Sequence, residues 1–211
     1  MDLSNRLFRS SYTTADPFAV FYVDPDHVKY PTERPPTKPG IVDSGDWDSE
    51  YRPFTEANTV AKSIQMRFDN NVEWDYTPLK DVYQEEYGDD FRVKFEEDCD
   101  RSAKLYDSMR SAGYRSQKQL LKDDYQNTLD LMDNEDVHPL MNEVGISIGR
   151  NGELLWTARG QHRLAIAKLL SVDKIPVRII ARHGGWEKKR REENCRPTGS
   201  PHPDLEFAYK Y

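Results

Sequence analysis

A glycine followed by an amide, an imidazole and a guanidinium is the part of this sequence best suited to chemistry. The run precedes apolar residues at helical spacing. Glycine lets a ligand approach the backbone, and the first turn of a helix leaves N–H groups without internal partners. Anions bind at such helix starts, and a guanidinium pairs with phosphate oxygens. The pattern predicts a phosphate site, the alternative being a glycine turn with a solvated Arg and a locally bonded His. The residues concerned are Arg159, Gly160, Gln161, His162 and Arg163.

The segments around this run are predicted to form a small α/β unit. Apolar residues alternate over 144–148, an Asn-Gly pair supplies a tight turn, and residues 154–156 form a second apolar run, which together indicate a β-hairpin. Helical spacing follows over 164–170, and residues 175–180 are typical of a further strand. The glycine of the run therefore lies at a junction between a strand and a helix.

This region resembles the signature region of the ParB/sulfiredoxin superfamily. The resemblance rests on the sequence Arg-Gly-Gln-His-Arg-Leu at 159–164, with the hairpin before it and the helix and strand after it, and it covers residues 144–183. In that superfamily a Gly-x-His-Arg or Gly-x-Arg-Arg box at a helix start binds nucleotide phosphates. The resemblance implies an α/β fold with a small mixed sheet, and a nucleoside triphosphate or diphosphate bound by residues 159–163.

The best-known catalytic residues of the superfamily are replaced in this box. In sulfiredoxin the second position is a catalytic Cys, whereas Gln161 cannot form a thiolate. In the free-serine kinases an Asp precedes the glycine, whereas Arg159 cannot accept a proton from a hydroxyl. In the partition proteins a helix-turn-helix DNA-binding domain follows, whereas only a short segment follows His183 here. The resemblance thus implies binding, and it leaves open whether the chain is an enzyme.

If the protein is an enzyme, its acid or base is expected from the proline-rich segment 25–53, which is predicted to be a long irregular connection. Within it, Asp46 and Asp48 flank Trp47. Such carboxylates could bind Mg²⁺ beside a phosphate or act as a general base. The alternative is that the tryptophan anchors the loop while the acids accept hydrogen bonds from backbone N–H groups. The sequence has no other set of residues at metal-ligand spacing.

The composition indicates a folded protein with long surface segments. Hydrophobic residues make up 36% of the 211 residues and charged residues 32%, while 12 Tyr, 8 Phe and 4 Trp are more than disordered chains carry. Cys99 and Cys195 match neither a disulfide framework nor a zinc motif. No signal peptide and no run of roughly 18 apolar residues is present, so we expect a soluble cytoplasmic protein without a membrane partner.

Positive charge is concentrated near the box. The net charge is −7, yet residues 150–191 hold 11 Lys and Arg against 3 Asp and Glu, a balance of +8 that leaves −15 elsewhere. A nucleotide needs only a local positive field. The alternative partner is DNA, contacted through this basic segment, and it predicts steep salt dependence of binding.

Several helices are predicted between the first strand, at residues 18–23, and the hairpin. Apolar spacing indicates helices over 55–70 and 91–112, and Thr77-Pro78 is typical of a helix start with the Thr hydroxyl as cap. Ser116 is expected to cap another helix. These helices are expected to form an insertion at about 55–136.

The remaining segments are assigned by their polarity. Acidic residues at 96–98 and 100 are expected to form a solvated helix face, because neighbouring carboxylates do not converge on one point. His138 and His183 are expected to pack locally rather than bind metal. We expect a single domain over residues 1–192, followed by an extended tail at 193–211.

The sequence predicts a nucleotide-binding protein, with a nucleotide-dependent phosphotransferase or nucleotide hydrolase as the candidate activity and Mg²⁺ as a candidate cofactor. Two alternatives stay open. One is a nonenzymatic, nucleotide-responsive module associated with DNA, and the other is an interaction protein whose pocket is vestigial.

Overall fold

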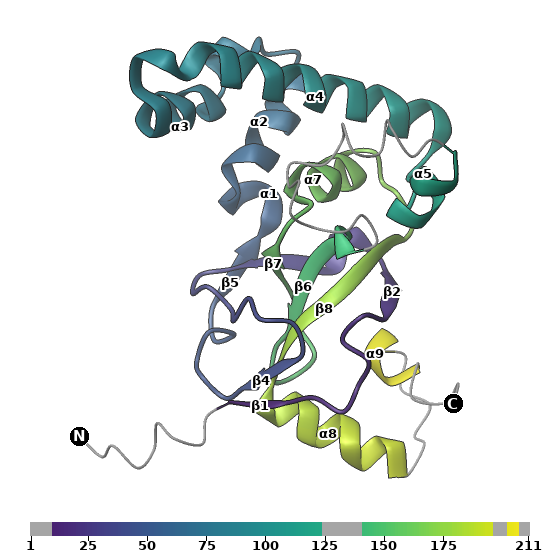
Figure 1. The fold of residues 1–211 in the computed structure, drawn as a ribbon. Helices are drawn as coiled ribbons and strands as arrows, with labels where there is room; N and C mark the ends of the chain where they lie inside the picture. The colour runs from purple at the N-terminus through teal and green to yellow at the C-terminus, as the bar shows by residue number, and fades with distance from the viewer. Residues whose placement is uncertain (1–9, 124–140, 196–201, 207–211) are drawn as a thin grey trace, which may run out of the picture.

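A mixed sheet with helices at both of its ends forms the body of the protein (Figure 1). The computed structural model describes residues 10–123, 141–195 and 202–206. Within these ranges eight strands form one sheet, in the order β1-β4-β8-β6-β7-β3-β5, with β2 also paired to β8. The α/β class expected from the sequence is confirmed, with a mixed sheet and several helices.

The central strand β8 (Ile175–His183) is buried along its whole length. It runs parallel to β6 (Val144–Ile148) and β4 (Ile41–Asp43), and antiparallel to β2 (Val20–Val23). Four of its nine residues are Ile or Val, which suits a strand covered on both faces. The predicted strand at 175–180 is confirmed, and it continues three residues further.

The predicted hairpin is also confirmed. Strand β6 pairs antiparallel with β7 (Leu154–Ala158), and the turn contains Gly152 at a φ of +98°. A Cβ on this glycine would lie 2.8 Å from the Trp186 ring, so the turn needs a residue without a side chain. Beyond β7 the sheet continues with β3 (Val28–Pro31) and β5 (Tyr51–Pro53), and β1 (Ser10–Tyr12) pairs with β4 at the other edge.

Segment 25–53 is more regular than predicted. It contains β3, β4, β5 and a short 3₁₀ helix, η2 (Pro25–His27), instead of one long irregular connection. Each strand has only three or four residues, too few to show a period in the sequence. These strands form because β7, β8 and one another offer hydrogen-bonding partners.

The helical insertion covers one end of the sheet. Helix α4 (Phe91–Ala112) has the predicted bounds and crosses above α7 (Gln161–Leu169) in Figure 1. The helix predicted at 55–70 is split, because Asn58 ends the first part and caps the second. Ser116 caps its helix as predicted, whereas the Thr77 hydroxyl donates to the Trp74 carbonyl instead. The other elements of the insertion are α1 (Phe54–Ala57), α2 (Thr59–Phe68), η3 (Trp74–Tyr76), α3 (Pro78–Tyr87), η4 (Gly88–Asp90) and α5 (Gln117–Asp123).

Parts of the predicted insertion fall on residues 124–140, which lie outside the described residues, as does His138. Within the described ranges, no helix combines the length and the apolar character needed to cross a membrane.

The C-terminal segment differs from the extended tail predicted at 193–211. Helix α8 (Gly184–Cys195) lies at the end of the sheet opposite α4, and α9 (Pro203–Glu206) packs against it. The Asp204 carboxylate accepts hydrogen bonds from Arg182 Nε at 3.0 Å and Nη2 at 2.5 Å, and from Trp186 Nε1 at 2.8 Å. A guanidinium buried on the central strand needs a carboxylate, and this segment supplies it.

We predict that Asp204→Asn lowers the free energy of unfolding by about 3 kcal/mol at pH 7, because it leaves the buried Arg182 charge without a counterion. Burial alone would raise the pKa of Asp204, but hydrogen bonds and charge from Arg182 outweigh it and hold the pKa below its ordinary value. The stabilisation is therefore complete above the unfolded pKa of about 3.9 and is lost as the pH falls through the folded pKa.

Urea unfolding of the parent and the variant between pH 3 and pH 8 measures this effect. Asp173→Asn, at an exposed position in the turn before β8, is the matched control and should change stability by less than about 0.5 kcal/mol. Equal stability of the Asp204 variant and the parent at pH 7 would contradict the anchoring role of this segment.

Candidate functional site

A cavity of about 340 Å³ lies where β7 ends and α7 begins. Its lining joins the start of α7 to side chains from α4 and α5, and to Arg34 from the loop after β3. The structure brings all five residues of the predicted phosphate box, 159–163, to this lining. The candidate site is therefore built from segments more than 120 residues apart in the sequence.

The backbone at the start of α7 passes unusually close to β6. Arg159 and Gly160 both have left-handed φ angles, +57° and +66°. A Cβ on Gly160 would lie 2.8 Å from Val144 Cγ2 and 3.1 Å from Val144 Cα. The carbonyl of Arg159 accepts a hydrogen bond from Trp156 Nε1 at 3.0 Å, which fixes the turn. Glycine is thus required by conformation and by space.

The first turn of α7 has free N–H groups. Gly160 is the N-cap residue and provides no side-chain hydrogen bond, and its carbonyl accepts from Leu164 N at 2.8 Å. No described residue accepts a hydrogen bond from the backbone N–H of Gln161, His162 or Arg163. Free N–H groups and the positive end of a helix dipole are together suited to an anion.

Arg163 lines the cavity and also forms an ion pair with a carboxylate of the protein. Its Nη1 donates to Glu143 Oε2 at 3.2 Å, and its Nη2 donates to the Asn142 carbonyl. Glu143 also accepts from Gln117 N at 2.7 Å, at the start of α5. Burial raises the pKa of Glu143, and Arg163 offsets only part of that rise. The sequence assigned Arg163 to phosphate, but it also neutralises a buried acid that the sequence did not single out.

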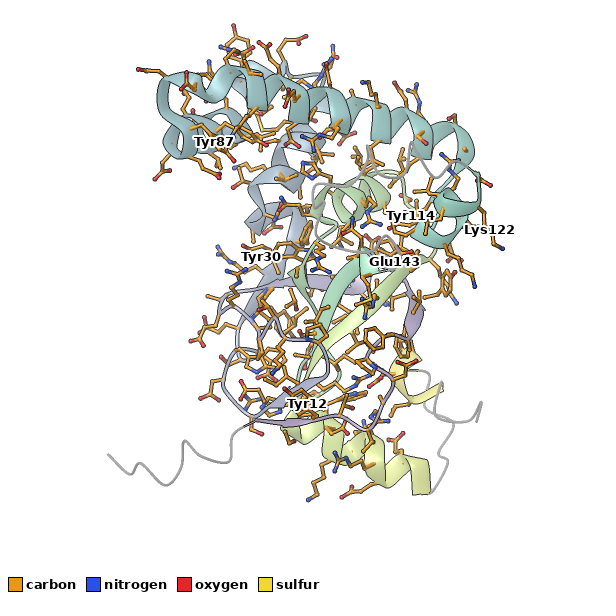
Figure 2. The ribbon with its side chains drawn as sticks, viewed as in Figure 1. Tyr12, Tyr30, Tyr87, Tyr114, Lys122 and Glu143 are labelled. Carbon is orange, nitrogen blue, oxygen red and sulfur yellow. The ribbon has the colours of Figure 1, made fainter. Side chains whose placement is uncertain are left out.

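Tyr114 lies beside this ion pair, and Figure 2 shows it close to Glu143 at the level of α7. Burial raises the pKa of its phenol to about 12, and the nearby Arg163 charge acts in the opposite direction. The phenol therefore stays neutral at physiological pH.

His162 is held by Asp98 of α4. The two side chains are joined by a hydrogen bond of 3.2 Å between His162 Nε2 and Asp98 Oδ2. Asp98 is only 5% exposed, so the expectation that all acids on this helix are solvated is wrong for this residue. Burial alone would raise its pKa, but the hydrogen bond and charge of His162, with further contributions from Tyr83 and Arg101, lower it below the ordinary value. Asp98 is thus a carboxylate at neutral pH.

Gln161 uses its side chain to join two helices. Its Oε1 accepts a hydrogen bond from Asn58 Nδ2 at 3.2 Å, while Asn58 Oδ1 accepts from Ala61 N at the start of α2. The Gln161 Nε2 amide donates to no described residue, so this group and the backbone N–H of Gln161 are both available to an anion.

Two buried polar atoms in the cavity lining have no hydrogen-bond partner among the described residues. They are Ser102 Oγ on α4 and Gln117 Oε1 on α5, in residues that are 1% and 4% exposed. Buried polar atoms are nearly always hydrogen-bonded in proteins. Polar groups of a ligand in this cavity would satisfy both atoms.

Guanidinium groups outnumber carboxylates around the cavity. Four arginines line it, at positions 34, 101, 159 and 163, with Asp98 as the acidic member of the lining. Arg34 is exposed and makes no ion pair or hydrogen bond with any described residue. Arg159 donates to the Met141 carbonyl at 3.2 Å, a neutral partner that leaves its charge uncompensated. The local field therefore favours an anion.

Asp46 and Asp48 lie away from the box. Arg150, in the turn of the hairpin, donates from Nη2 to Asp48 Oδ1 at 2.7 Å and to Asp46 Oδ1 at 3.1 Å. The box follows the other end of the same hairpin, and β7 separates the two positions by about 17 Å at 3.3–3.4 Å per residue. Burial would raise the pKa of Asp48, but hydrogen bonds from Arg150 lower it. The structure does not bring these acids to the cavity.

No group of three or more His, Cys, Asp or Glu that could hold a metal ion occurs among residues 10–123, 141–195 and 202–206. His183 packs at the end of β8, where its Nδ1 accepts from Gly185 N at 3.0 Å and its Nε2 lies 3.2 Å from the Gly45 carbonyl. Its ring therefore makes local contacts at the end of the strand.

A second hollow of about 470 Å³ lies beside the opposite end of α7. Its most unusual group is Lys168, whose pKa burial lowers to about 8 and whose Nζ lies 3.8 Å from Asp26 Oδ1. The lining of this hollow contains no arginine, and the helix that begins there, α1, has only four residues. The first cavity is the better candidate site, although it is smaller.

Comparison of the chain with models of protein families, with curated proteins and with solved structures gives no match. The function is therefore argued from the cavity and from the sequence of the box.

We predict that Gly160→Ala destabilises the protein by about 2–3 kcal/mol, from about 1 kcal/mol of left-handed backbone strain and the displacement of Val144. Thermal and urea unfolding measure the loss.

A double-mutant cycle with Val144→Ala provides the control. The smaller side chain removes the Cγ2 atom that lies nearest to the added Cβ, so the double variant should lose less stability than the sum of the two single variants. Strict additivity would show that the close approach at β6 does not determine the need for glycine.

Proposed function

We propose that this protein binds a nucleotide in the cavity at the start of α7, with the phosphates at the helix terminus, on a fold of ParB/sulfiredoxin type. The observation that carries the proposal is the convergence of three free N–H groups with the uncompensated charges of Arg34 and Arg159 in one cavity. Helix N-termini and guanidinium groups both bind phosphate in proteins. The Gly-Gln-His-Arg sequence supports the same ligand.

The rest of the lining suits the base and the sugar. Trp156, Leu105 and Leu120 supply apolar surface, and Ser102 and Gln117 supply unpaired polar atoms. Small-ligand sites combine mainly apolar walls with a few polar groups, in volumes of about 300–1,000 Å³. A nucleotide, which joins an aromatic base to an anionic chain, matches both parts of this cavity better than inorganic phosphate does.

The alternative of a DNA-associated module receives less support. It relied on the excess charge of segment 150–191, and most of these cations are paired with acids of the protein. The pairs include Arg150–Asp48, Arg163–Glu143, Lys168–Asp26, Arg182–Asp204, and Arg190 and Arg191 with Glu187.

Isothermal titration calorimetry with ATP, ADP, CTP and GTP, with and without Mg²⁺, tests the proposal. Arg159→Gln and Arg34→Ala should each weaken binding of the preferred nucleotide by about tenfold or more, since each removes a charge-assisted contact with phosphate. Arg163 is a poorer probe because its removal would leave Glu143 buried without a counterion.

Arg52→Ala is the matched control. This arginine is exposed on β5 and is not part of the cavity lining, so its removal changes the net charge equally but should leave affinity within about twofold. The proposal fails if none of the four nucleotides binds the parent protein, or if both cavity variants bind as tightly as the control.

A further inference from the structure

We infer that His162 is the general base of a nucleotide hydrolase and that Asp98 is its positioning residue. The inference rests on the proposed function, because it assigns chemistry to the nucleotide placed in the same cavity. It differs from the acid or base expected from the sequence, which was Asp46 or Asp48, since these lie at the far end of the hairpin.

The Asp98 carboxylate determines which nitrogen of His162 can accept a proton. Since the pKa of Asp98 lies below its ordinary value, the side chain is ionised at neutral pH and can only accept hydrogen bonds. The 3.2 Å contact with His162 Nε2 therefore requires a proton on Nε2. In the neutral ring the lone pair is then on Nδ1, which makes no hydrogen bond with any described residue.

The Tyr83 phenol interacts with Asp98, and burial together with the Asp98 charge raises the pKa of this phenol, so that it stays protonated. The His162 side chain is 17% exposed and forms part of the cavity lining. An imidazole oriented by a buried carboxylate beside a substrate pocket is the arrangement that general-base catalysis uses.

The reaction is the addition of water to a phosphoanhydride. His162 Nδ1 takes a proton from a water molecule, and the water oxygen forms a bond to the terminal phosphorus. The bond from phosphorus to the bridging oxygen breaks, and its electron pair leaves with the nucleotide. Arg34 and Arg159 lie at the lining where the phosphate oxygens gain charge. The products are inorganic phosphate and the shortened nucleotide, and His162 returns its proton to solvent.

The test is phosphate release by the full chain with the nucleotide that calorimetry shows to bind, with and without Mg²⁺. His162→Gln keeps the backbone N–H and should lower kcat about 100-fold or more, while the dissociation constant changes by less than about threefold. In the parent, kcat should rise with pH through one titration, and this limb should be absent from the variant. Added imidazole should restore part of the activity of His162→Ala.

Asp98→Asn tests the positioning role. It should lower kcat and alter the pH dependence, whereas Asp100→Asn removes the same charge from an exposed position on α4 and should leave activity unchanged. Circular dichroism and calorimetric binding of each variant separate a loss of chemistry from a loss of folding.

The outcomes are distinguishable. Nucleotide binding without any phosphate release by the parent overturns this inference and leaves the proposed function intact. Turnover by His162→Gln at the parent rate also overturns it. If no nucleotide binds the parent protein, the proposed function and this inference fail together.

Discussion

The cavity depends on the close approach of the chain to strand β6 at Gly160. A Cβ at position 160 would collide with Val144. Because Gly160 has none, β7 can turn directly into α7 through two residues with left-handed φ angles. The residues that follow, 164–167, are buried between the sheet and α2, so the direction of the helix is fixed over its length. A helix start held in this way presents its N–H groups in one orientation, which is the preorganisation that anion binding requires.

Helix α4 supplies the second wall and is held to α7 by a hydrogen bond as well as by apolar contact. Asp98 meets His162 in the first turn of α7, and in the next position along the helix Arg163 meets Glu143, which precedes β6. Removing one member of a buried pair leaves the other uncompensated, at a cost of several kcal/mol. The insertion and the sheet are therefore energetically coupled through the same turn that faces the cavity, and ligand binding there would stabilise both.

Local signals in the sequence predicted the elements that place the box, because hairpins, glycine junctions and long amphipathic helices depend on residues close in sequence. This accounts for the hairpin, for α7, and for the bounds of α4. The partners in the cavity could not be predicted in this way. Asp98 belongs to an acidic run whose other acidic residues are exposed. Its hydrogen-bonding partner, His162, lies 64 residues further along the sequence. Likewise, nothing local in the sequence around Asp204 indicates that Arg182 needs a counterion.

The uneven charge of the sequence has an explanation within the fold. Segment 150–191 has a balance of +8 and the remainder −15, which first indicates a surface for a polyanion. In the structure, acidic residues from outside the segment form ion pairs with its cations. These pairs lie at both ends of the hairpin, on the central strand and along α7. The two parts of the chain are therefore complementary, and much of the positive charge is a set of internal counterions. The cations left to interact with a ligand are those at the cavity. There, Arg159 from the segment and Arg34 from outside it have no carboxylate partner among the described residues. A field of this size can hold the phosphates of one nucleotide, whereas tracking a nucleic-acid backbone would require an extended row of unpaired cations.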